Sequence, residues 1–117
     1  MEQKAWKIFE DDNGPRFIMH GLNGTKRIKL DIVLTAKLAR VRDGSGKRWY
    51  QSGFHVYRTR ELLKSFIKSL SIFKNRYAVQ VYVSELIPKH ERSRASLSTK
   101  IMLSSEDWDK RIPIKDF

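Results

Sequence analysis

The sequence of 117 residues contains no cysteine, only three prolines and six glycines. Without cysteine, disulfide bonds, thiolate metal sites and a thiol nucleophile are excluded. Long apolar runs are also missing, because none approaches the roughly 18 residues of a membrane span. The first nine residues do not have the pattern of a signal peptide. We therefore expect one cytoplasmic domain, residues 1–117, with no membrane partner.

Acidic residues are scarce in the middle of the chain, where residues 26–100 hold only five. They are Asp31, Asp43, Glu61, Glu85 and Glu91. Hydrolysis by paired carboxylates and phosphoryl transfer by two metals both need clustered acids, so neither is expected here. The histidines, at positions 20, 55 and 90, have no spacing that requires a metal. We predict no metal site, and we favour a binding protein without a cofactor over an enzyme.

Positive charge, in contrast, is abundant and unevenly distributed. The net charge is +11, and residues 26–100 alone hold 18 Lys and Arg, which gives this middle a net charge of +13. Such an excess attracts polyanions, chiefly nucleic acid or an acidic protein surface. The alternative is a solvated surface that only keeps the protein soluble.

One helix is predicted over residues 59–73. Its apolar positions recur at helical spacing: Leu62, Leu63, Phe66, Ile67, Leu70 and Phe73. Thr59 is suited to cap the first turn, and Phe66 is expected to be buried. On the opposite, solvated face, Arg60, Lys64 and Lys68 follow one another at steps of four.

Strands are predicted over 5–9, 16–20, 27–33, 77–86 and 101–103. Residues 34–39 stay open between strand and a short helix beginning near Asp31. A turn at 43–46 predicts a hairpin of 38–42 with 47–51. Residues 88–100 show no apolar period and are expected to form an exposed basic loop. The fold class is therefore α+β, a mainly antiparallel sheet with one principal helix.

Three groups of residues are candidates for binding nucleic acid. Lys47, Arg48, Trp49 and Tyr50 place aromatic rings beside cations, the composition of a platform for single strands, although such rings also serve as strand packing. The helix row of residues 60, 64 and 68 is the second group. The loop cations are the third: Lys89, Arg92, Arg94 and Lys100.

Several short strings resemble small uncharacterised proteins of tailed bacteriophages. The strings are Met19-His20-Gly21-Leu22-Asn23-Gly24, Lys47-Arg48-Trp49-Tyr50 and Ser52-Gly53-Phe54-His55-Val56-Tyr57. The resemblance implies a phage-encoded accessory protein in the host cytoplasm, and it implies no activity.

The His20-Gly21 pair, the Gly53-Phe54-His55-Val56 string and the valine-rich strand after the helix are similar to the ADP-ribosyltransferase-like core, in its tRNA 2'-phosphotransferase branch. The similarity implies an NAD pocket in which His20 binds the nicotinamide ribose and the Gly21 backbone holds the amide. His55 would stand where many relatives have a tyrosine, so we expect His20 and His55 to line one cleft. The last predicted strand has no glutamate for catalysis.

The preferred hypothesis is a basic accessory protein that binds nucleic acid or another polyanion without strong sequence preference. The alternative is an NAD-binding protein or RNA-modifying transferase with a degenerate site. A further alternative is an inhibitor that binds an acidic host protein.

Overall fold

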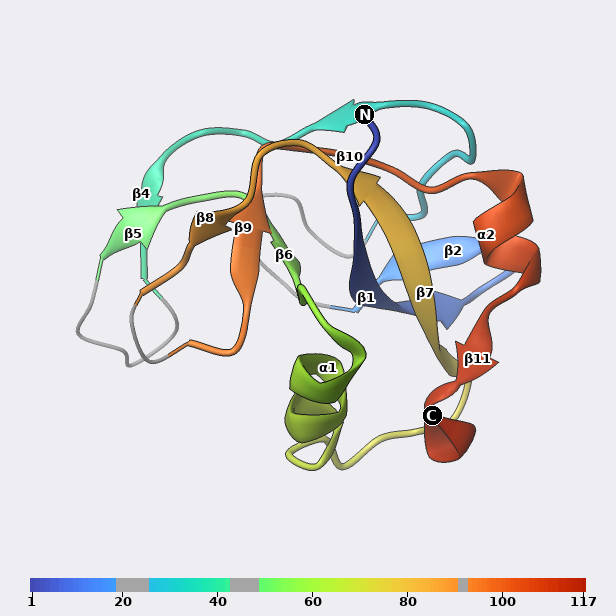
Figure 1. Cartoon of the computed structure of the whole chain (residues 1–117). Coiled ribbons are helices and arrows are strands. Elements are labelled where there is room, and N and C mark those ends of the chain that lie inside the picture. The colour runs from blue at the N-terminus through green and yellow to red at the C-terminus, as the bar shows by residue number, and fades with distance from the viewer. Residues whose placement is uncertain (19–25, 43–48, 91–92) are drawn as a thin grey trace.

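The structure, a computed structural model, describes residues 1–18, 26–42, 49–90 and 93–117. Its centre is the antiparallel pair of β1 (Lys4–Asp11) and β7 (Arg76–Val83), in register from Lys4 opposite Tyr82 to Glu10 opposite Arg76. The main sheet has the order β2-β1-β7-β10-β3, and β11 also pairs with β7 (Figure 1). These strands are β2 (Pro15–Phe17), β3 (Leu34–Thr35), β10 (Lys100–Met102) and β11 (Ile112–Pro113).

A smaller group of strands lies beside the main sheet, on the left in Figure 1. It consists of a three-stranded sheet, β6-β9-β8, and a two-stranded hairpin, β4-β5. Their bounds are β4 (Arg40–Val41), β5 (Tyr50–Gln51), β6 (Phe54–Val56), β8 (Ile87–Pro88) and β9 (Ser96–Ser98). Together with helices α1 (Arg60–Ile67) and α2 (Ser105–Asp109) and a 3-10 turn at Ile114–Asp116, this confirms the predicted α+β class.

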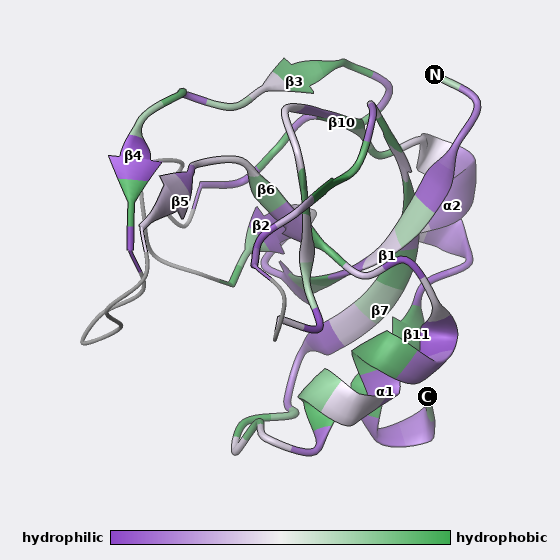
Figure 2. Ribbon diagram, turned by 60° about the vertical axis from the view of Figure 1, so that its left-hand side comes forward, coloured by the Kyte–Doolittle hydropathy of each residue, from purple (hydrophilic) through white to green (hydrophobic). Residues whose placement is uncertain are grey.

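Strand β1 separates two apolar cores, because successive side chains of a strand point to opposite faces. Phe9, fully buried, packs in the first core with Phe17 and Trp108, at ring-centroid distances of 5.8 and 6.5 Å. Ile8 belongs to the second core, which also holds Leu63 of α1. Hydrophilic and hydrophobic colours alternate along the ribbon of β7, which lines both cores (Figure 2).

Helix α1 begins as predicted and ends earlier. The Thr59 hydroxyl accepts a hydrogen bond from the Leu62 amide at 3.2 Å, which confirms the cap. The helix stops at Ile67 instead of residue 73, because the Ser69 hydroxyl donates to the Phe66 carbonyl at 2.7 Å and competes with the helical bonds. Phe66 is only partly buried, stacked on Tyr57 at 5.1 Å, so its predicted burial in the core is wrong.

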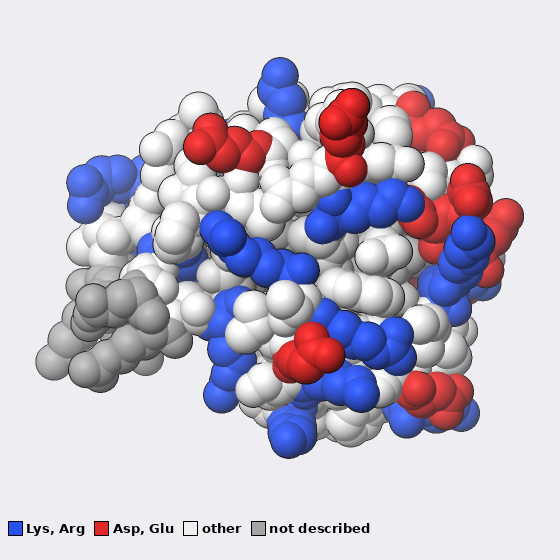
Figure 3. All heavy atoms as spheres, viewed as in Figure 1, with Lys and Arg blue, Asp and Glu red and all other residues white. Residues whose placement is uncertain are grey.

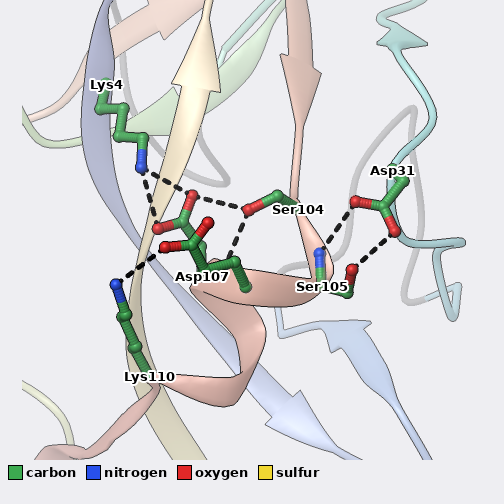
Figure 4. A network of polar contacts seen from close by, with 7 residues as sticks. Lys4, Asp31, Ser104, Ser105, Asp107 and Lys110 are labelled. Atoms are coloured by element: carbon green, nitrogen blue, oxygen red, sulfur yellow. Dashed lines mark hydrogen bonds and ion pairs between the residues drawn. The ribbon is translucent and has the colours of Figure 1, made fainter.

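The strand predicted over residues 27–33 is also wrong. Arg27 makes one isolated bridge to Arg16, and a turn follows at 30–31 in which Asp31 has a φ of 61°. The Asp31 carboxylate accepts bonds from the Ser105 amide (3.0 Å) and hydroxyl (2.8 Å), where α2 begins (Figure 4). This attachment to a helix 74 residues away turns the segment out of strand geometry, and β3 forms only at Leu34.

The exposed loop predicted over residues 88–100 is in fact partly a buried strand. Leu97 of β9 is 4% exposed and Ser98 is fully buried. The Ser98 hydroxyl accepts from the Ser84 amide at 3.1 Å and donates to the Lys100 carbonyl at 2.6 Å. Since its hydroxyl is satisfied, serine is buried here at little cost in free energy.

The remaining predicted strands are confirmed with adjusted ends. The segments predicted at 5–9, 77–86 and 101–103 correspond to β1, β7 and β10, and β2 covers the start of the segment predicted at 16–20. The predicted hairpin is confirmed by the pairing of Arg40 with Gln51 and of Val41 with Tyr50, while its turn lies outside the described residues. In the part of the chain that the structure describes, no helix is long and apolar enough to cross a membrane.

Candidate nucleic-acid interface

Four carboxylates from the N-terminal and C-terminal segments, Asp11, Asp12, Glu106 and Asp107, are paired with cations, and we call these carboxylates and their partners the acidic end. Its ion pairs are Lys4–Asp107 (2.9 Å), Arg16–Asp12 (3.0 Å), Arg27–Asp12 (3.6 Å), Lys110–Glu106 (3.0 Å) and Arg111–Asp11 (3.4 Å). Asp107 is 6% exposed, and its carboxylate also accepts a hydrogen bond from the Ser104 hydroxyl at 2.9 Å (Figure 4). The Asp107 amide in turn donates to the Ser104 hydroxyl at 3.0 Å, which caps α2. The hydrogen bond to Asp107 raises the pKa of Lys4. The Lys4–Asp107 pair, whose carboxylate is buried, therefore supports the fold, whereas an exposed pair such as Lys110–Glu106 contributes little to stability.

A second charged region, which we call the basic surface, consists of Arg58, Lys64, Lys68 and Arg94. All four are exposed. Ala95, the residue after Arg94, is buried in the same core as Leu63 and Ile67 of α1, so the chain at Arg94 adjoins the core that α1 covers. Figure 3 shows Lys and Arg side chains gathered through the middle of this face and down over α1, whereas Asp and Glu are frequent around α2.

Arg60, the first member of the predicted helix row, has different surroundings. It is partly buried, and its guanidinium lies 4.1 Å from the centroid of the Phe117 ring and 5.6 Å from that of Trp6. These contacts attach the end of the chain to α1. Arg60 therefore supports the fold, and of this row only Lys64 and Lys68 are exposed.

Beyond the basic surface, strands β5, β8 and β9 enclose a pocket of about 220 Å³, which we call the aromatic pocket. It is lined by Trp49, Tyr50, Gln51, Ser52, Ile87, Pro88, Lys89, Leu97 and Thr99. Trp49 is 54% exposed, and the guanidinium of Arg42 lies 5.3 Å from its ring centroid. The predicted candidates Trp49, Tyr50 and Lys89 thus lie together in space.

Tyr50 forms the fixed part of this pocket. The ammonium group of Lys89 lies over its ring at 4.8 Å, and the His55 ring meets it edge-on at 6.0 Å. These contacts tie the β4-β5 hairpin to β8 on one side and to β6 on the other. The rings of the pocket are consequently held in place before any ligand binds.

Five candidates cannot be placed, because Lys47, Arg48, Arg92, His20 and Gly21 lie outside the described residues. The shared cleft of His20 and His55 therefore stays a prediction. Lys100 is exposed on β10, opposite Thr35 of β3. In the sequence, strand β9 stands between Lys100 and β8. No group of three His, Asp or Glu side chains suited to a metal is present among the residues that the structure describes.

Lys7 is a charged residue that the sequence did not single out. It is 8% exposed, and its ammonium group lies 5.5 Å from the Phe17 ring centroid and donates to the His55 carbonyl at 2.7 Å. Burial lowers the pKa of Lys7 to about 8 from 10.5. The available signal was its position in the predicted strand, because residues 5, 7 and 9 of a strand share one face and Ala5 and Phe9 are apolar.

Comparison with protein-family models, with curated proteins and with solved structures finds no match for this chain. The resemblances to phage proteins and to the ADP-ribosyltransferase-like core stay predictions.

Proposed function

We propose that this protein binds nucleic acid through the basic surface, with little preference for sequence. The observation that carries the proposal is the segregation of charge. At the acidic end, carboxylates and cations pair within 3.6 Å, whereas the basic surface presents four exposed cations on neighbouring elements. Exposed Lys and Arg gain from contact with phosphates because binding releases counterions from the nucleic acid.

Nucleic acid is favoured over an acidic protein surface by the aromatic pocket, whose rings have cations of their own beside them. Trp49 is a large exposed ring with a cation beside it, and Tyr50 lies in the same pocket under Lys89. Rings interleaved with cations suit a ligand that carries both bases and phosphates. Cations of this kind contact the backbone, which is the same for every sequence, so weak sequence preference follows. An accessory role of this kind also suits the resemblance to phage proteins.

The test is the salt dependence of binding to a labelled oligonucleotide, measured by fluorescence anisotropy. If the four cations of the basic surface each contact a phosphate, log affinity should fall against log salt with a slope of about 3 for a single strand. Oligonucleotides of different sequence should bind with similar affinity. Affinity that is unchanged between low and physiological salt would overturn the proposal. Tighter binding of poly-glutamate than of the oligonucleotide would instead identify an acidic protein as the partner.

A further inference from the structure

We propose that the aromatic pocket receives one unpaired base, so that the protein selects single strands over duplex. This inference rests on the proposed function and adds the form of nucleic acid that is bound. A base inside a duplex is stacked between its neighbours and cannot enter a pocket unless it leaves the helix, which costs free energy. A single strand offers its bases without that cost.

The size of the pocket suits a small, flat occupant. Its volume of about 220 Å³ lies below the about 300–1,000 Å³ of sites that enclose drug-sized ligands. One base with its ring buried is an occupant of the right scale, and the attached sugar and phosphate would remain outside. The cations needed to meet that phosphate lie at the pocket, with Lys89 in its lining and Arg42 against Trp49.

The lining also has the composition that stacking requires. Ile87, Pro88 and Leu97 give the pocket an apolar side, on which the face of a base loses contact with water. Tyr50 has Lys89 over its ring and His55 at its edge, and Trp49 has Arg42 at 5.3 Å from its ring centroid. Trp49, which is 54% exposed, is the more accessible ring for stacking on a base. Every base has a π-face, and such stacking is therefore tolerant of sequence.

Two polar residues of the lining differ in what they offer to a base edge. The Ser52 hydroxyl accepts from the Ala39 amide at 2.9 Å and donates to the Lys37 carbonyl, so it serves the backbone between β3 and β4. Gln51 is exposed, and its amide both donates and accepts. A side-chain amide of this kind can meet either a donor or an acceptor on a base edge, and sequence-tolerant stacking on Trp49 would contribute most of the binding. The pocket consequently favours an unpaired base without choosing among the four.

The experiment compares three ligands of equal length by fluorescence anisotropy at one salt concentration. They are a single-stranded oligonucleotide, the same strand with every base replaced by an abasic spacer, and the duplex. Since stacking is worth about 1–3 kcal/mol per base, the intact strand should bind about 5- to 140-fold more tightly than the abasic strand. It should also bind more tightly than the duplex. Since Trp6 and Trp108 also emit, the quenching that Trp49 contributes is the part that Trp49→Phe abolishes, and this part should appear with the intact strand only, because quenching needs a base on the ring.

Trp49→Ala should remove the difference between intact and abasic strands, and Trp49→Phe should retain most of it. Phe73→Ala is the matched control, because Phe73 is an aromatic residue with 42% exposure outside the pocket lining. Equal affinity for intact and abasic strands, with steep salt dependence, would overturn the pocket inference and leave the proposed function standing. Absence of binding to all three ligands at low salt would overturn both.

Discussion

The acidic end and the basic surface are both rich in charge, yet they use it differently. At the acidic end Asp107 is 6% exposed and 2.9 Å from Lys4, and the other carboxylates also face cations. On the basic surface the side chains of Lys64, Lys68 and Arg94 extend into solvent. The comparison teaches that net charge alone does not locate a binding surface. A cation that already faces a carboxylate is less available to a polyanion than an exposed cation on a surface rich in Lys and Arg.

The largest expected effect is a difference in unfolding free energy between variants of the two apolar cores, one next to α2 and one beneath the basic surface. Phe9→Ala, in the core next to α2, should cost about 3–5 kcal/mol of unfolding free energy, because a fully buried ring is replaced by a cavity. Phe66→Ala, beneath the basic surface, should cost clearly less, since Phe66 is partly exposed and can be replaced by water. Chemical denaturation of both variants makes the measurement. Equal costs would show that the α1 core is packed as tightly as the core around Phe9.

The second effect concerns Lys7, a cation that is buried and yet belongs to neither charged region. Its pKa is lowered to about 8 in the folded protein and is near 10.5 when unfolded. Between these values the unfolded chain binds more protons, so the free energy of unfolding rises with pH. From pH 7 to pH 9.5 the gain should be about 2 kcal/mol. The raised pKa of Lys4 acts only above this window.

Lys7→Met is the control for this prediction, because it removes the titrating group and keeps a long side chain in the same space. Denaturation curves at pH 7 and pH 9.5 should show the gain in the native protein and little of it in the variant. The same gain in both proteins would mean that the general loss of positive charge at high pH, and not Lys7, is responsible.

The smallest effect distinguishes the members of the helix row. Arg60→Gln should cost about 0.5–1 kcal/mol, because the guanidinium leaves the Phe117 and Trp6 rings. Lys64→Gln and Lys68→Gln should each change stability by less than about 0.5 kcal/mol, since both side chains are exposed. Thermal denaturation resolves the order. A larger loss from Lys64→Gln than from Arg60→Gln would place Lys64 among the residues that support the fold.

How much of the fold could be predicted depends on how local its causes are. The Thr59 cap and the apolar period of α1 are local, and both were predicted. The end of α1 was missed because Leu70 continues the apolar period while the Ser69 hydroxyl ends the helix. The turn at Asp31 and the burial of Ser98 depend on bonds to residues 74 and 14 positions away. Such long-range bonds leave no local pattern.

The candidate site shows the same division. Trp49, Tyr50 and Lys89 were named from composition alone, since rings beside cations are typical of nucleic-acid binding. That Gln51 and Leu97 share their pocket follows from the packing of β5 beside β8 and β9, which no short stretch of sequence contains. The separation of paired from exposed cations likewise requires both chain ends to be in place.

The central claim is that the basic surface, and not net charge, holds the nucleic acid. Its most direct test compares the double variant Lys64→Gln, Arg94→Gln with the double variant Arg27→Gln, Lys110→Gln, whose cations are paired with Asp12 and Glu106 at the acidic end. Each removes two exposed cations, so the two variants have equal net charge. The account predicts that the slope of log affinity against log salt decreases by about 1.5 for the first variant and stays unchanged for the second. An equal decrease for both variants would contradict it.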